Sequence, residues 1–469
     1  MKSISLMWKL YGQLCSVLRV FVTGSALIFV GCSGDDATQT PSPSATQSTL
    51  NSAVMAIPIS TTEADRFQTV IGTTGERYYA AGFDTTNGDR RMASARLSPT
   101  SSLDTSFGQG DIAAVNVAVG GKTAEFARGV VVQSGGKIVI AGPVEHDPSA
   151  TGDAARDTDI AVVRFDSTGQ LDPTFGINGI VRLDLSTEVV DGPAFRGDTS
   201  WGLTLLPEDD LLVVDGELAD GAGRTDIDYA VVKLAPNGAV DTTFEETGRV
   251  TLDVEQGGDS PRTAIVQPDG TNHVVTTVLF RLLQNGRFDS SFGTNGVVSV
   301  ALLASVAEAY DVALQGQNLV IAGYGRAVSP GTVDIISARF FPDGTWDKTY
   351  GEKGVAMIDV AGQDDRSRKV PILPDQRVLI VGQGKPTATA QDGAVVLLTP
   401  DGQRDTTLNG NGVVLIDFGS SADALFGLTL SPDKTGAVAV GWKGVDAVAV
   451  SPTNNDDARF VHFSLPMAQ

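Results

Sequence analysis

The sequence is poor in the residues that build disulfides and transition-metal sites. Its 469 residues include two cysteines, Cys15 and Cys32, both near the start of the chain. The rest of the chain therefore has no disulfide and no thiolate that could act as a nucleophile. The three histidines, His146, His273 and His462, are far apart in the sequence. This argues against zinc clusters and multi-histidine metal centres.

Positive charge and aromatic residues are also scarce. Lysine and arginine number 34 against 56 acidic residues, which gives a formal net charge of −22. Such a chain repels phosphates and offers no basic groove, so we expect no nucleic-acid partner. Aromatic residues make up 6% of the chain, whereas glycine occurs 53 times. This composition favours short elements joined by many tight turns.

One apolar run near the N-terminus, residues 20–30, follows a stretch with basic and no acidic residues. Eleven residues are too few to span a bilayer comfortably, so residues 1–31 are predicted to be an export signal. The run ends at Gly31-Cys32-Ser33, which resembles the lipobox of bacterial lipoproteins, although Phe29 stands where that family usually has leucine. The resemblance implies that Cys32 is acylated and holds the protein on a lipid bilayer. An ordinary secretory peptide with an incidental cysteine is the alternative.

Residues 32–52 are small, polar and punctuated by proline, a composition that predicts a flexible tether. Ser33 after the cysteine resembles lipoproteins that are sent to the outer membrane of Gram-negative bacteria. We therefore expect an exported protein that is lipid-anchored to the cell envelope. A single folded domain is expected over residues 53–466.

One turn motif, D-[TPSK]-[ST]-[FYL], recurs six times along the chain and is usually followed by a glycine. Recurrence every 48 to 69 residues in a strand-rich chain indicates an array of similar supersecondary units. The aspartate can accept a hydrogen bond from the N–H two residues on, and the aromatic residue can plug the turn against a sheet. The copies begin at Asp104, Asp172, Asp241, Asp289, Asp347 and Asp405, and Phe107, Phe175, Phe244 and Phe292 are the phenylalanines of the first four.

Two further positions keep a fixed distance from the motif aspartate. Eight residues before it, five of the six copies have a basic residue, namely Arg96, Arg164, Lys233, Arg281 and Arg339, and His462 takes the matching place in the last unit. Seven residues after it, five copies have a glycine, namely Gly179, Gly248, Gly296, Gly354 and Gly412. Catalytic residues are seldom needed six times, whereas joints between repeats are. We therefore predict a structural role, in which the basic residue reaches a carboxylate or a turn carbonyl of its own or the next unit.

Each unit is expected to form four short strands joined by hairpin turns. The repeats are placed near residues 66–119, 126–187, 200–255, 262–302, 309–360, 368–418 and 425–465. The last unit lacks a fourth strand, and pairing it with residues 53–59 would close a ring without an open edge. The expected fold is all-β, a seven-bladed β-propeller of four-stranded antiparallel blades. The fourth blade is expected to be degenerate, because its short interval shows no turn between the second and third strands; a very tight hairpin is the alternative.

Residues 169–179, GQLDPTFGING, match the pattern G-x-L-D-x-[ST]-F-G-x-x-G at every point. On this motif the chain resembles the delta-60 repeat family of bacterial secreted proteins, over roughly residues 60–465. Departures are Glu245 and Asn409 for the first glycine, and Tyr350 and Leu408 for phenylalanine. The resemblance implies a propeller-like fold and no established common activity.

Other candidate sites are weaker. Two acidic loops offer Asp153, Asp157, Asp220 and Asp226 as calcium ligands, but they lack the spacing of a calcium-binding loop. No cofactor is therefore expected, and calcium stays an alternative. No nucleophile elbow occurs, and nothing selects a pair of carboxylates for glycoside cleavage. Trp201, Trp346 and Trp442 are expected to serve packing.

The leading functional hypothesis is a monomeric, non-catalytic module that binds or scaffolds a protein or glycan partner at the cell surface. One alternative is a hydrolase or lyase that acts on an extracellular polymer through carboxylates at the propeller channel. Another is a purely structural envelope component. Acidic and aromatic residues gathered at one channel mouth would favour the enzyme.

Overall fold

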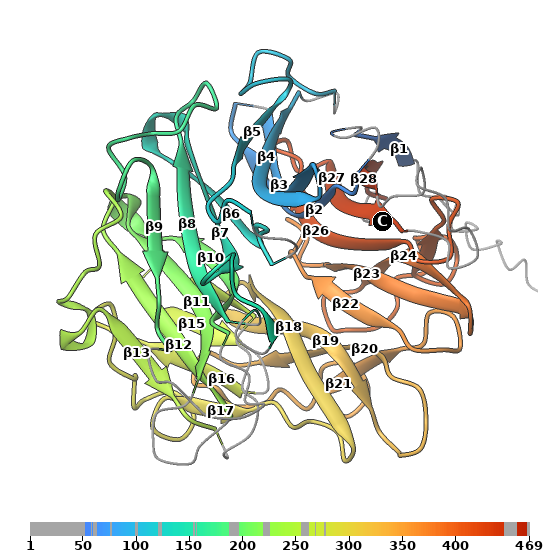
Figure 1. The fold of residues 1–469 in the computed structure, drawn as a ribbon. Helices are drawn as coiled ribbons and strands as arrows, with labels where there is room; N and C mark the ends of the chain where they lie inside the picture. Colours follow the sequence, from blue (N-terminus) through green and yellow to red (C-terminus); the bar gives the residue numbers. More distant parts are fainter. Residues whose placement is uncertain are drawn as a thin grey trace, which may run out of the picture. The chain divides into compact units, whose positions relative to one another are not determined.

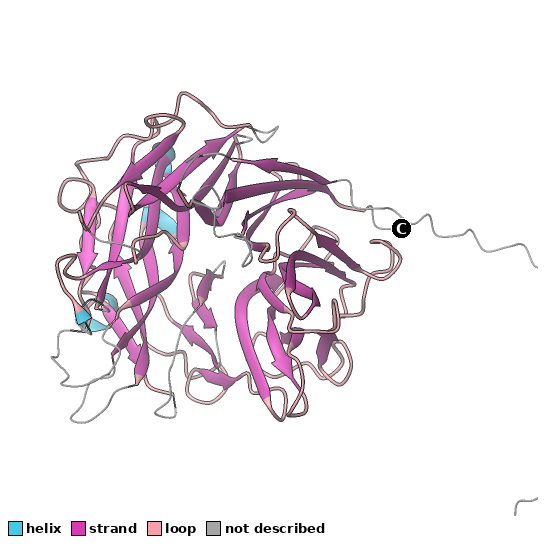
Figure 2. Cartoon of the chain, turned by 45° about the vertical axis from the view of Figure 1, so that its right-hand side comes forward, coloured by secondary structure: helices cyan, strands magenta, loops and turns pink. Residues whose placement is uncertain are grey.

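The computed structural model describes residues 52–466 except 58, 60–62, 76, 99–101, 121–123, 153–154, 156, 187–196, 219–225, 255–261, 268, 276–277 and 445–456. The predicted export signal, Cys32, Asp153 and Asp220 lie outside the described residues. The described chain is built of strands (Figure 2), and its helices are the single turns η1 (Ser134–Gly136), η3 (Pro207–Asp209) and η4 (Phe244–Glu246). None of the helices in this described part has the length and apolarity needed to cross a bilayer.

Six antiparallel sheets are each built from four strands that follow one another in the chain (Figure 1). The first three sheets consist of β2 (Arg66–Thr73), β3 (Arg77–Thr86), β4 (Asp89–Leu97) and β5 (Ile112–Val115); β6 (Gly129–Gln133), β7 (Lys137–Glu145), β8 (Thr158–Phe165) and β9 (Ile180–Leu183); and β10 (Thr199–Leu205), β11 (Leu211–Leu218), β12 (Ile227–Leu234) and β13 (Arg249–Leu252). The next three consist of β14 (Thr263–Val266), β15 (Asn272–Val275), β16 (Val278–Leu282) and β17 (Val297–Ser299); β18 (Val306–Gln315), β19 (Asn318–Arg326), β20 (Asp334–Phe340) and β21 (Val355–Ile358); and β22 (Arg366–Lys369), β23 (Val378–Thr387), β24 (Ala390–Leu398) and β25 (Val413–Ile416).

A further four-stranded sheet joins the two ends of the chain, in the order β1-β28-β27-β26. The last repeat supplies β26 (Ala424–Leu430), β27 (Gly436–Lys443) and β28 (Asp457–Ser464), and the outer strand is β1 (Ser52–Ala56). β1 runs antiparallel to β28, with Val54 opposite Val461. Ile57 follows β1, is buried, and donates its N–H to the carbonyl of Ala458 at 3.1 Å. The first strand thus covers an edge that the last repeat would leave open.

The first strand of each sheet contacts the first strand of the next, from β2 through β6, β10, β14, β18 and β22 to β26, and β26 contacts β2 again. The middle strands are mostly buried, and β8 is buried over its full length. Their side chains fill the space between neighbouring sheets. Val139 and Val162 of one sheet, for example, pack in a single cluster with Leu211 and Val213 of the next. This arrangement gathers the first strands around a common axis.

The predicted fold class, a seven-bladed propeller with a degenerate fourth blade, needs a correction. Six blades are continuous units of four consecutive strands, and the fourth repeat forms one of them, β14-β15-β16-β17. Its strands are short, and two residues, 276–277, separate β15 from β16. Val274 pairs with Phe280 and Val275 with Leu279, so a tight hairpin keeps all four strands within the short interval. The missing turn signal reflected a short connection and not a lost strand.

Candidate functional site

The recurring aspartates form the turns that the motif indicated. Oδ1 of Asp172 accepts hydrogen bonds from the N–H of Thr174 at 3.0 Å and from its hydroxyl at 2.7 Å. A serine or threonine two residues on makes the same pair of bonds at Asp104, Asp241, Asp289, Asp347 and Asp405. The side-chain bonds fix the turn because they reproduce the pattern of a backbone turn.

The residues after the aspartate close the turn against the sheet. The motif aromatics Phe107, Phe175, Phe244 and Phe292 are all buried. Gly179 has a φ of +93°, and a Cβ there would lie 2.5 Å from the side chain of Leu171. Only glycine fits such a position without strain. Positive φ angles also occur at Gly248, Gly296, Gly354 and Gly412.

Arg164 ties its turn to the next sheet. Its Nε lies 3.0 Å from Oδ2 of Asp172, and its Nη1 donates to the carbonyl of Pro236 in the following repeat. Corresponding contacts to the aspartate and to a carbonyl of the next repeat are made by Arg96, Arg281 and Arg339. Lys233 instead pairs with two carboxylates of its own repeat, Asp241 and Asp210, each at 2.8 Å. The motif therefore forms a joint between sheets, and its carboxylates are already occupied by cations and N–H donors.

Two units depart from this pattern. In the sixth repeat Leu397 stands where the others have a basic residue. Arg377, from the turn before β23, forms the ion pair with the motif aspartate instead. Its Nη1 lies 3.1 Å from Oδ2 of Asp405, and its Nη2 donates to the carbonyl of Pro466 at 2.6 Å. His462 lies within β28, opposite Ala53 of β1 and Val438 of β27. It is a strand residue at this position, as its alignment with Arg164 suggested.

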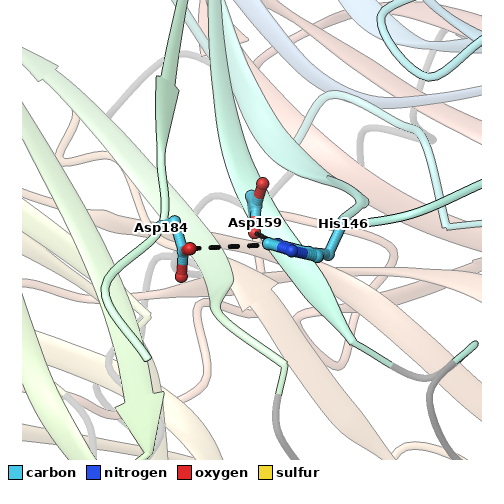
Figure 3. Close-up of side chains that lie close together, drawn as sticks. All are labelled: His146, Asp159 and Asp184. Atoms are coloured by element: carbon cyan, nitrogen blue, oxygen red, sulfur yellow. Dashed lines mark hydrogen bonds and ion pairs between the residues drawn. The ribbon is translucent and has the colours of Figure 1, made fainter. Parts of the chain in front are cut away.

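His146, Asp159 and Asp184 lie together where β7, β8 and β9 meet (Figure 3). Nδ1 of His146 lies 2.7 Å from Asp159 and 3.9 Å from Asp184. The hydrogen bond to Asp159 raises the pKa of His146, and Arg182 forms an ion pair with the same carboxylate. Asp159 is thus held by a hydrogen bond with His146 and by an ion pair with Arg182, and the cluster is a network of such contacts. Asp157 lies beside it and accepts a hydrogen bond from the N–H of His146 through its carbonyl.

Three further groups of carboxylates lie at equivalent places, namely Asp226, Asp228 and Asp253; Asp334, Asp359 and Asp365; and Asp392, Asp417 and Asp423. Asp365 accepts the N–H of Val360 at 2.7 Å, and Asp423 accepts that of Phe418 at 2.6 Å. Glu125 and Asp198 hold the loop ahead of their own first strands in the same way. These acids form a second recurring joint, which the sequence analysis missed although its positions recur.

Five of the first strands carry a bulge that turns one residue out of the ladder. The register shifts around Gln68 in β2, Trp201 in β10, Tyr310 in β18, Arg368 in β22 and Phe426 in β26. A bulge re-aims a side chain and is common beside functional sites. These residues line one pocket, together with Arg128, Arg262 and Lys369. Because the first strands surround the axis, the pocket is axial, and we call these eight residues the axial pocket.

Arginines and aromatic rings alternate around this pocket. The guanidinium carbon of Arg128 lies 3.5 Å from the ring centroid of Trp201, and that of Arg262 lies 4.0 Å from it. Arg262 also lies 4.4 Å from the ring of Tyr310, which Arg368 approaches to 4.5 Å. Arg368 continues the stack at 4.3 Å from Phe426. Such contacts orient the cations but supply no hydrogen-bond acceptor in the guanidinium plane.

Several donors of these arginines are buried without an acceptor. They are Nε of Arg128, Nε and Nη1 of Arg262 and Nε of Arg368, none of which has a hydrogen-bond partner among the described residues. Burial and the neighbouring Arg262 lower the pKa of Arg128 to about 9, and burial lowers the pKa of Arg368. Buried donors and cations are costly unless they are satisfied. The arrangement is therefore suited to an anion.

The size of the axial pocket limits what can enter. Its cavity of about 50 Å³ is several times the roughly 10–15 Å³ that one ordered water needs. It admits a small anionic group and not a polymer chain. A larger hollow of about 780 Å³ runs along β21 beside Trp346 and Met357. That hollow contains no orphaned buried side-chain donor among the described residues, so the axial pocket is the stronger candidate.

Residues 133–175 and 373–408 match the model of a family described as a β-propeller domain of unknown function, DUF5122. The chain is a β-propeller repeat protein. Both matches end in a copy of the turn motif, the first at Phe175 and the second at Leu408. No curated protein matches the propeller significantly.

Solved structures similar to the propeller are diverse. A streptogramin B lyase has a TM-score of 0.47 at 9% identity, covering 88% of this chain and 98% of its own. A Dyadobacter fermentans protein of unknown function has the same score at 10% identity, with the same coverage. Virginiamycin B lyase from Staphylococcus aureus scores 0.46 at 8% identity, covering 89% and 99%. At these values the similarities say nothing about the activity of the propeller.

Proposed function

We propose that this propeller is a non-catalytic binding module of the cell envelope, which holds an anionic group of a protein or glycan partner in its axial pocket. The observation that carries the proposal is the set of buried arginine donors without an acceptor around this pocket. Preorganised, buried donors are typical of binding sites, because a bound anion satisfies them all at once.

The charges beside the pocket favour binding over catalysis. The eight lining residues, all of them described, include no carboxylate. Two acids in contact with its cations are paired, Glu308 with Arg262 at 2.7 Å and Asp311 with Lys369 at 3.2 Å. Lysis or hydrolysis of a polymer at this place would need a free acid or base and room for the polymer. The binding function needs neither.

The proposed location rests on the N-terminal sequence. Basic residues, a short apolar run and Gly31-Cys32-Ser33 support export and acylation of Cys32, and the polar residues up to 52 would let the propeller stand away from the membrane. Metabolic labelling with a radioactive fatty acid tests this part. We expect label in the wild type and in Cys15→Ser, and none in Cys32→Ser. Label in Cys32→Ser would contradict the anchor.

Calorimetric titration of the soluble chain from residue 51 onward with sodium sulfate and with sodium acetate, at matched ionic strength, tests the binding function. We expect one site per chain for at least one of these anions, and binding at least tenfold weaker in Arg128→Met and Arg368→Met. Arg287→Met is the matched control, because Arg287 is an exposed arginine with loose ion pairs to Glu245 and Glu246. No binding by the wild type, or equal binding by all variants, would refute the proposal.

A further inference from the structure

The charges around the axial pocket do not balance. Of its four cations, Arg262 and Lys369 each have a carboxylate partner. Arg128 donates only to the carbonyl of Ser200 at 3.4 Å. Arg368 donates to the amide oxygen of Gln383, also at 3.4 Å. No carboxylate of the described residues pairs with Arg128 or Arg368, so two positive charges are uncompensated.

Asp215 is an acid close enough to influence Arg128, but it is ill suited to balance its charge. It is fully buried in β11. Burial, together with the nearby carboxyls of Asp198 and Glu217, raises the pKa of Asp215 well above its usual range. Burial thus disfavours the charged form of Asp215 that would balance Arg128.

The two unpaired arginines flank the same cavity. Arg128 and Arg262 both lie against the ring of Trp201, and Arg262 and Arg368 both lie against the ring of Tyr310. The cavity thus brings donors of different strands to one bound group. A carboxylate brings one charge and a planar pair of oxygens, whereas a phosphate monoester brings about two charges and three oxygens that diverge in space.

We infer that the axial pocket selects a doubly charged tetrahedral oxyanion, the head group of a phosphate monoester, over a carboxylate. This inference rests on the proposed binding function and names its ligand class. The small cavity admits the head group alone, so the group must be terminal on its carrier. In a site of low polarity, the two negative charges of the oxyanion compensate both Arg128 and Arg368, whereas the single charge of a carboxylate compensates one arginine.

Competition between simple anions tests the selectivity. We expect sulfate, and phosphate at pH 8, to bind at least tenfold more tightly than acetate or formate to the chain from residue 51 onward. Arg128→Met and Arg368→Met should each reduce the preference to less than threefold, and Arg287→Met should leave it unchanged. Equal affinities for mono- and dianions, abolished by the same variants, would overturn the inference while the binding function stands. No binding of any anion would remove both.

A gain-of-affinity variant guards against loss through misfolding. Glu308 compensates Arg262 at 2.7 Å, so Glu308→Gln should release a third cation and tighten sulfate binding several-fold. If Glu308→Gln shows a cooperative thermal unfolding transition but binds sulfate no more tightly than the wild type, this result would count against the inference. Glucose 6-phosphate and glucosamine 6-sulfate test the role of the second charge, because at pH 8 the phosphate ester carries two negative charges and the sulfate ester carries one. We expect the phosphate ester to bind more tightly, and tighter binding of the sulfate ester would contradict the inference. Binding of both sugars no tighter than of acetate would overturn the inference.

Discussion

The guanidinium of Arg128 lies over the ring of Trp201 at 3.5 Å, while that of Arg262 lies 4.0 Å from the same ring centroid. Two guanidiniums so close to one centroid must lie on opposite faces of the ring. Trp201 is thus sandwiched between cations, and its faces are closed to other ligands. The tryptophan orients the arginines, and the arginines are the groups available for binding.

Replacing Arg128 by methionine should leave the melting temperature of the ligand-free protein unchanged or raise it. The variant removes a buried cation without a carboxylate partner and keeps an apolar chain against Trp201. Thermal unfolding followed by circular dichroism in an anion-poor buffer measures this. If Arg128 mainly supports the fold, its replacement should lower the melting temperature. A fall of several degrees would therefore assign Arg128 a structural role.

Asp172→Ala should destabilise the protein by about 3–5 kcal/mol, because it leaves the buried Arg164 without a counter-charge. Asp147 makes the same pair of turn hydrogen bonds, to Ser149, but is exposed and has no cation in contact. Asp147→Ala is therefore the matched control and should change stability little. Urea unfolding of both variants gives the comparison. Similar losses in the two would mean that the turn itself, and not the ion pair, supplies the stability.

Stability should fall as the pH rises from about 4 to about 7. Burial raises the pKa of Glu125 and of Asp198 to about 7, so the folded state holds protons that the unfolded chain loses near pH 4. The stabilisation is complete below the unfolded pKa and is lost as the pH rises through the folded pKa. Melting temperatures at pH 5 and 8 should show the fall, and Asp198→Asn should reduce it. Asp147→Asn is the control; a slope unaffected by Asp198→Asn would disprove the assignment.

The motif aspartates act in the opposite direction at low pH. The hydrogen bond from Ser106 lowers the pKa of Asp104 to about 2, and the bond from Lys233 does the same for Asp241. Their contribution is present above about pH 4 and is lost as the pH falls through 2. The two groups of acids together place the stability maximum near pH 4 to 5, and the same melting series extended to pH 2 locates it.

A chain that begins at Ala64 should be less stable and more prone to aggregate than one that begins at Asn51. It lacks β1 and Ile57, whose burial alone is worth about 2–3 kcal/mol, and it exposes the edge of β28. Melting temperature and light scattering report the two effects. A synthetic peptide of residues 51–63 should restore part of the stability when it is added in trans. Identical melting of both chains would show that β1 is dispensable.

Features that repeat could be predicted from the sequence, and features that vary between repeats could not. The motif at Asp172 and its partner Arg164 recur at constant spacing, so their role as a joint could be predicted. The axial positions hold different residues in different units, for example Gln68, Trp201 and Tyr310. A comparison of the repeats for shared residues therefore does not find them. The average charge of the chain also hid the site, because a cluster of arginines at one point barely alters a net charge of −22. The prediction of a degenerate fourth blade was wrong because a two-residue connection leaves no recognisable turn signal.

The pairing of β1 with β28 makes closure of the ring an event in time as well as in space. A chain made from its N-terminus presents β1 long before its partner strand, Asp457–Ser464, exists. Until that strand is made, β1 lacks its native partner and its edge is open to other strands. Synthesis of the last repeat therefore sets the time at which the ring can close.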